Sequence, residues 1–274
     1  MNIFQYCHTI LFSPGLDSKL LSPSLVDSYD LCPRIAIDEV PELPERDHGI
    51  SFTDEKNKFP SSKSLVDIKS RARALHFFAN HELLAIEMMA CAILLFPIEG
   101  EQGVRFRKRL LATIADEQKH FNLYVGRMQE WGVRFGDFSL NDYFWRQMRK
   151  VKSIEQFYAV VALTFEGANL DFALYYHNIF KDLGDKKTAT ILKTVLEDEI
   201  SHVRMGQKWL TDQYPEVDLW QVYVELLPDK LSPARAKGII FNEAARLKAG
   251  LNEEFIDSLK QYRDEFPVVN RSNK

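Results

Sequence analysis

The sequence predicts an all-α protein built around a bundle of four long helices, with an irregular N-terminal arm and extra C-terminal helices. One observation is that no proline occurs between Pro97 and Pro215, where the apolar residues recur with helical spacing. The second is that no strand-like alternation of comparable length is present. The third is that proline and glycine residues divide this region into four helical segments of about 30 residues. Each segment would be about 45 Å long as a helix.

Residues 1–61 are predicted to form a loop-rich arm. Six of the eleven prolines fall within the first 60 residues, and proline interrupts helices and central strands. Apolar clusters such as IFQYC and PRIAIDEV indicate that the arm packs on the rest of the protein. We therefore divide the chain into an arm over 1–61 and a helical body over 62–274.

The helical body divides at proline and glycine. Gly132 and Gly184 are expected to cap helix ends, and Ser153 with Gln156 fits a capping box. Two pairs of long helices predict a four-helix bundle. The long helices are expected over 64–96, 102–131, 153–183 and 185–213, and shorter ones over 140–150, 234–248 and 252–265.

Composition narrows the class of protein. The chain is 46% hydrophobic and 27% charged with a net charge of −4, which argues against a dedicated nucleic-acid binder. The longest apolar stretch, near 90–96, is too short to span a membrane, and the N-terminus lacks the basic start of a signal peptide. Cys7, Cys32 and Cys91 form no CxxC pair, so we expect a reducing, cytoplasmic location.

The second and fourth predicted helices carry the same motif, D-E-x-x-H. A glutamate and a histidine three residues apart lie on one helix face and can reach the same metal ion. A chain of this composition would contain the motif by chance about 0.03 times. The two copies, 82 residues apart, are Asp116, Glu117 and His120, and Asp198, Glu199 and His202.

The first and third helices supply matching acids. Glu82 lies 35 residues before Glu117, and Glu166 lies 33 residues before Glu199, so an antiparallel hairpin brings each acid level with a motif. The chain therefore reads as a duplicated helix hairpin. Unpaired buried carboxylates are costly, and two divalent ions would balance four of them. The predicted metal ligands are Glu82, Glu117, His120, Glu166, Glu199 and His202.

Glu87 is an alternative ligand. It follows Glu82 by five residues, about 140° around a regular helix, so both face one site only across a π-bulge. Glu82 is preferred because its separation from Glu166 nearly repeats that between the two motifs. Asp171 stands five residues after Glu166 and is the position equivalent to Glu87 in the second hairpin.

Asp116 and Asp198 are expected behind the metal ligands, each accepting a hydrogen bond from the histidine of the opposite motif. His76, His81 and His177 belong to no motif and are expected to be packing or surface groups. No catalytic residue is assigned from the sequence.

Several segments resemble the ferritin-like superfamily, and more closely the bacterial ferritin-like family catalogued as domain of unknown function number 455. They are HFFANHELLAIE, ADEQKHFNLYVGRM, FEGANLDF and LEDEISHVRMGQKW, within about 65–250. The resemblance implies a four-helix bundle with a dinuclear metal centre, most often iron, and it assigns no substrate. Similar sites occur in the tRNA hydroxylase acting on modified adenosine, demethoxyubiquinone hydroxylase, ribonucleotide reductase small subunits and rubrerythrins. This chain has Asn80 where many family members carry a histidine.

The leading hypothesis is a non-haem di-iron oxidoreductase that activates O₂ or peroxide. Glu117 and Glu199 would bridge two ions, Glu82 and Glu166 would be terminal ligands, and one histidine would bind each ion. A centre with one iron and one manganese ion, or with two manganese ions, remains an alternative. The alternative is a non-catalytic iron-binding or ferroxidase-type protein.

These hypotheses imply a small-molecule substrate or O₂ and leave room for an electron-donor protein. No membrane span is expected. A nucleic-acid partner is not expected from the charge, although a modified tRNA substrate and a homodimer stay open.

Overall fold

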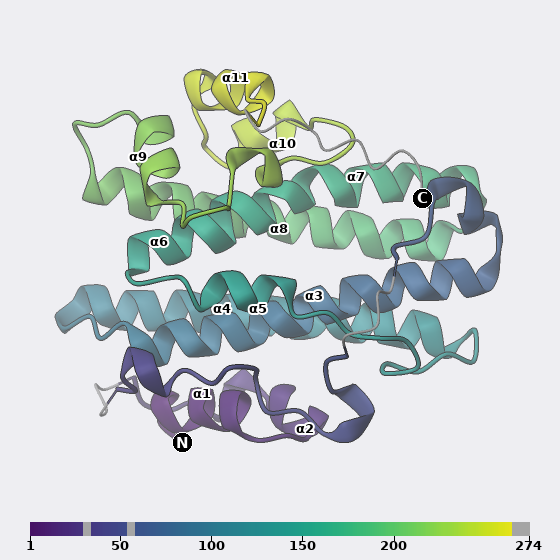
Figure 1. The fold of residues 1–274 in the computed structure, drawn as a ribbon, viewed down its shortest axis with the longest axis horizontal. Helices are drawn as coiled ribbons and strands as arrows, with labels where there is room; N and C mark the ends of the chain where they lie inside the picture. The colour runs from purple at the N-terminus through teal and green to yellow at the C-terminus, as the bar shows by residue number, and fades with distance from the viewer. Residues whose placement is uncertain (30–33, 54–57, 265–274) are drawn as a thin grey trace.

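Four long helices form the centre of the protein, in a computed structural model that describes residues 1–29, 34–53 and 58–264. α3 (Ile68–Leu95) packs along α4 (Gly100–Gln129), and a composite third helix packs along α8 (Lys186–Gln213). Figure 1 shows these two hairpins stacked on each other. No strand occurs in the described ranges, which confirms the all-α prediction.

The third long helix contains a π-helical segment. It runs through α6 (Ile154–Tyr158), the π segment Ala159–Glu166 and α7 (Gly167–Asp182), where the sequence predicted one regular helix. Thr164 Oγ1 donates to Ala159 O at 2.8 Å and lies 2.9 Å from the Tyr223 hydroxyl. These contacts satisfy the Thr164 hydroxyl and the Ala159 carbonyl inside the π-helical turns, where the backbone hydrogen bonds differ from those of a regular α-helix.

The helix ends follow the predicted glycines. Gly132 and Gly184 both have positive φ, +73° and +76°, which side-chain-bearing residues rarely adopt. The capping box is only half right. Ser153 Oγ accepts from Gln156 N, but Gln156 Oε1 accepts from Lys152 N at 2.9 Å and not from Ser153.

The N-terminal arm covers the first hairpin. It contains α1 (Ile3–Phe12), α2 (Leu16–Lys19) and short 3₁₀ turns, and α1 packs against α3. Proline content did not predict α1, which is stabilised by Asn2 as a capping box with Gln5. Cys7 and Cys91 are buried free thiols, and Cys32 lies outside the described residues.

The C-terminal helices lie on the opposite side of the bundle from α1 (Figure 1). They are α9 (Leu219–Leu226), α10 (Glu243–Lys248) and α11 (Glu253–Gln261), while α5 (Tyr143–Met148) contacts α3. The single helix predicted over 234–248 is wrong, because a 3₁₀ turn over Pro233–Ala236 is followed by irregular backbone. Asp171 holds that backbone by accepting from the amides of Gly238 and Asn242. The last residue of the helix predicted over 252–265 lies outside the described residues.

Two helical stretches are long and apolar enough to cross a membrane by length and composition. They are α3 and the composite helix over Ile154–Asp182, and 78% and 83% of their most apolar windows are buried in the protein. Both are central helices of the bundle, and core helices pass the same test of length and composition.

Candidate metal centre

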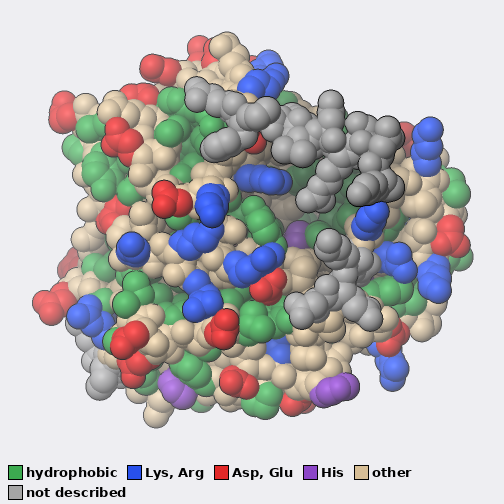
Figure 2. All heavy atoms as spheres, viewed as in Figure 1, with side chains coloured by type: hydrophobic (Ala, Val, Ile, Leu, Met, Phe, Trp, Pro, Cys, Tyr) green, Lys and Arg blue, Asp and Glu red, His purple; other side chains and the backbone are tan. Residues whose placement is uncertain are grey.

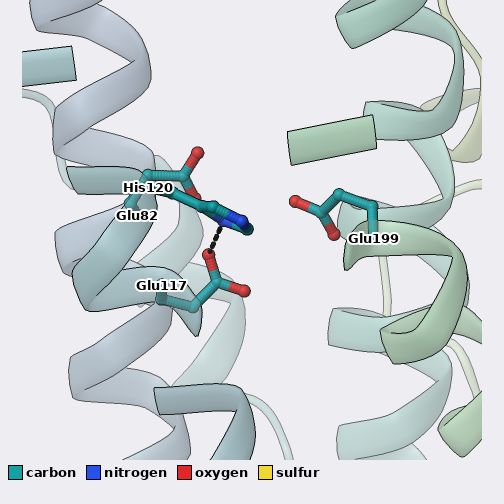
Figure 3. Close-up of side chains that lie close together, drawn as sticks. All are labelled: Glu82, Glu117, His120 and Glu199. Atoms are coloured by element: carbon teal, nitrogen blue, oxygen red, sulfur yellow. Dashed lines mark hydrogen bonds and ion pairs between the residues drawn. The ribbon is translucent and has the colours of Figure 1, made fainter. Parts of the chain in front are cut away.

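The two hairpins bring the six predicted ligands together at the middle of the bundle. Glu82 lies on α3, Glu117 and His120 on α4, and the other three on the second hairpin. Figure 3 shows residues of α3 and α4 facing Glu199 of α8 across the space between the hairpins. None of the six is more than 6% exposed: Glu82, Glu117, His120, Glu166, Glu199 and His202.

The six residues form two overlapping sets. Within each set, one ligand atom from every residue lies within 4.8 Å of the others. Glu117 and Glu199 belong to both sets, so each can contribute to two ions. The first set adds Glu82 and His120, and the second adds Glu166 and His202.

Each histidine turns one nitrogen to the cluster and the other to an aspartate. His120 Nδ1 is 3.1 Å from Glu117 Oε2, and its Nε2 is 2.9 Å from Asp198 Oδ2. His202 Nδ1 is 3.1 Å from Glu117 Oε1, and its Nε2 is 3.3 Å from Asp116 Oδ2. The histidines thus contact the aspartates of the opposite motifs, and such contacts set ring orientation.

Two further residues of the site were missed by the sequence reasoning. Lys119 Nζ lies 3.3 Å from Asp116 Oδ1 and 2.5 Å from Asp198 Oδ2, and so links the two aspartates. Asn169 Nδ2 donates to Glu199 Oε1 at 2.8 Å. The available signal for Asn169 was its position three residues after Glu166, on the same helix face.

Several buried polar atoms of the cluster make no hydrogen bond within the described part of the chain. They include both carboxylate oxygens of Glu166, one oxygen each of Glu117 and Glu199, and Nδ1 of His202. Such atoms cost free energy when nothing binds them. Divalent cations would satisfy them, and a donor set of carboxylate oxygens and imidazole nitrogens suits iron or manganese. The residues present therefore fit a dinuclear centre.

The electrostatics of the metal-free cluster favour bound protons. Burial, reinforced by neighbouring carboxylates, raises the pKa of Glu82 well above its ordinary value, and burial does the same for Glu166. Burial would also raise the pKa of Glu117, but the hydrogen bond with His120 and the adjacent imidazole of His202 hold it below its ordinary value. Burial opposes protonation of His120, yet Asp198 and Glu117 raise its pKa to about 9.

We expect the stabilisation of the protein by Mn²⁺ to grow between pH 6.5 and about pH 9. In the metal-free protein, the raised pKa of His120 contributes stability below its ordinary value of 6.5, and this is lost as pH rises through about 9. Metal binding needs neutral imidazoles and ionised carboxylates, so it must displace these protons. Thermal unfolding with and without Mn²⁺ across this range measures the difference, and a constant difference would contradict the expectation.

Glu87, the alternative ligand, lies outside both sets. It is fully buried and pairs with Arg46 Nη2 at 2.7 Å and Lys19 Nζ at 3.3 Å, both from the N-terminal arm. Arg46 Nη1 also donates to Asn80 Oδ1. The structure therefore places Glu82 among the clustered acids and Glu87 on the face of α3 that the arm covers.

Asp171, the equivalent acid of the second hairpin, is paired in the same way. Its two oxygens lie 2.5 Å and 3.0 Å from Arg246 Nη1 and Nη2, and both residues are buried. The first helix of each hairpin thus has one glutamate in the cluster and, five residues later, an acid paired with an arginine of the covering segment. The sequence reasoning did not identify these arginine partners.

The histidines without a motif lie outside both sets. His76 stacks on Phe135 and accepts from the Gly136 amide, and His177 Nδ1 lies 2.7 Å from Ala189 O. His81 stacks on Phe144 with ring centroids 4.3 Å apart.

Comparison with known proteins identifies the family of this chain but assigns it no reaction. The family described as "Protein of unknown function (DUF455)" matches residues 19–257, a range that holds all six clustered residues. An uncharacterized protein of Haemophilus influenzae is 26% identical over 246 residues, which cover 84% of this chain and 85% of that protein. No solved structure matches. With most of its length matched, the chain belongs to this family of proteins of unknown function, DUF455.

Proposed function

We propose that this chain is a ferritin-like protein that holds two metal ions, with iron favoured, and activates O₂ or peroxide to oxidise a small molecule. The observation that carries the proposal is the pair of buried ligand sets that share Glu117 and Glu199. This is the ligand pattern of dinuclear carboxylate bundles, with one glutamate from each of two helices and Glu-x-x-His from each of the others.

The protein's own residues would position such a centre. Bound iron ions would supply electrons and open coordination positions for the reduction of O₂ or peroxide. Asp198 and Asp116 hold His120 and His202 with Nδ1 toward the cluster. Asn169 binds one oxygen of Glu199 and so restricts how that carboxylate turns. The remaining electrons would come from a reductant, for which an electron-donor protein is the expected partner.

An adjoining cavity favours an enzyme over an iron store. It has a volume of about 270 Å³, and four of the clustered acids line it: Glu82, Glu117, Glu166 and Glu199. A small substrate in this space would lie beside the ions. Ligand sites of enzymes are commonly apolar cavities with a few polar groups, as here.

Protein purified without chelator is expected to contain about two metal ions per chain, because two ligand sets share two carboxylates. Inductively coupled plasma mass spectrometry gives the metal identity and count. When Fe²⁺ is added in air, its uptake by the protein should stop near this ratio. Uptake of many irons per chain would favour storage instead, and protein that binds no iron or manganese would refute the centre.

A further inference from the structure

The cavity beside the cluster has a polar floor and an apolar wall. The four glutamates at its floor are buried, and the wall carries four phenylalanines together with alanine, valine and methionine side chains. Figure 2 views the molecule from the side of α5, with a histidine and apolar side chains set back among Lys and Arg side chains. A ligand here would contact mostly hydrocarbon.

Part of this wall is flat and aromatic. Phe144 and Phe165 stack with centroids 4.0 Å apart and planes within 6°. His81 also stacks on Phe144, with ring centroids 4.3 Å apart. Stacked rings of this kind accept a planar apolar group.

Arg235 supplies the positive charge of the cavity. It is the one Lys or Arg among the described lining residues, and its exposure places it at the mouth, away from the buried floor. The side chain of Arg235 makes no ion pair or hydrogen bond within the described part of the chain. Arg146, by contrast, is paired with Asp142. The 3₁₀ turn that carries it is held where Ala236 O accepts from Arg246 Nη2 at 2.9 Å. An unpaired guanidinium at an apolar mouth is complementary to an acid.

We propose that this cavity binds a small hydrophobic carboxylic acid, with the acid at Arg235 and the hydrocarbon end against the floor of glutamates. Arg235 is the one Lys or Arg among the described lining residues, so the acid is expected at the mouth and the hydrocarbon inside, along the apolar wall. The inference rests on the proposed function only in assigning this ligand the role of substrate. Binding itself requires the cavity and Arg235.

The test uses three probes that differ only at one end: 4-phenylbutyrate, 4-phenyl-1-butanol and 4-phenylbutylamine. Titration calorimetry on the full-length, Mn²⁺-loaded protein should show the acid binding about three- to five-fold more tightly than the alcohol, with the amine weakest. Arg235→Gln should remove the preference and leave alcohol binding unchanged. Arg149→Gln, an exposed arginine that does not line the cavity, should keep it.

A second variant locates the binding site. Ala85 lines the cavity, so Ala85→Trp should fill it and weaken all three probes by at least about ten-fold, with unchanged metal content and helicity. Acid preference that persists in Arg235→Gln, or unchanged binding in Ala85→Trp, would overturn the inference. A protein without metal but with acid preference intact would refute the proposed function alone, because the probes report the cavity and metal analysis reports the centre.

Discussion

Glu117→Ala is expected to release both metal ions, whereas His202→Ala is expected to release about one. Glu117 belongs to both ligand sets and His202 to one, so the two truncations remove ligands from different numbers of ions. Starting from about two ions per chain, we expect fewer than about 0.5 in Glu117→Ala and about one in His202→Ala. Plasma mass spectrometry of matched preparations measures both values.

Glu197→Ala is the matched control for this experiment. Glu197 lies on the same helix as His202, its side chain is 63% exposed, and it pairs only loosely with Lys193, at 3.7 Å. Its loss should leave the metal content unchanged. Far-ultraviolet circular dichroism should show that all three variants keep their helices. Equal losses in Glu117→Ala and His202→Ala would contradict a shared carboxylate.

Arg246→Met is expected to lower the free energy of unfolding of the metal-free protein by about 3–5 kcal/mol. The substitution leaves Asp171, which is completely buried, without its charged partner. It also removes the donors that Arg246 Nη2 supplies to Gly167 O and Ala236 O. Urea denaturation followed by circular dichroism measures the loss.

Two comparisons separate a buried ion pair from an ordinary one. Arg46→Met should cost less, about 1–3 kcal/mol, because Lys19 still pairs with Glu87. Lys260→Met should cost less than about 1 kcal/mol, since its pair with Glu243 is half exposed. If Arg246→Met costs no more than Lys260→Met, the pair with Asp171 does not stabilise the second hairpin.

The candidate ligands were predictable because their pattern is local. The three-residue spacing of Glu117 and His120 places both on one face of any helix. The similar separations of Glu82 from Glu117 and of Glu166 from Glu199 follow from two antiparallel hairpins. The grouping of these side chains in the structure depends on no unusual backbone in α4 or α8. The sequence pattern was less regular in the proline-rich arm and beyond Pro215. There, α1 and α9 were not predicted, and one helix was predicted where the chain is broken.

The π-helical segment before Glu166 depends on contacts that no local pattern reveals. Thr164 has its hydroxyl beside that of Tyr223, 59 residues later. A Cβ on Gly206 would lie 2.4 Å from the Ala162 side chain, so α8 approaches the segment closely only because residue 206 is glycine. The helical periodicity of the sequence describes one helix at a time and contains no information about either contact.

By itself, the sequence determined the helical class, the duplicated hairpin and the six residues that face one another, because helix periodicity and hairpin length are local properties of the chain. Only the tertiary structure decided which cations pair with Glu87 and Asp171, the acids five residues after Glu82 and Glu166. Glu87 pairs with an arginine 41 residues earlier, and Asp171 with one 75 residues later. A buried carboxylate is stable only beside a cation, and which cation reaches it depends on how the covering segments fold over the bundle.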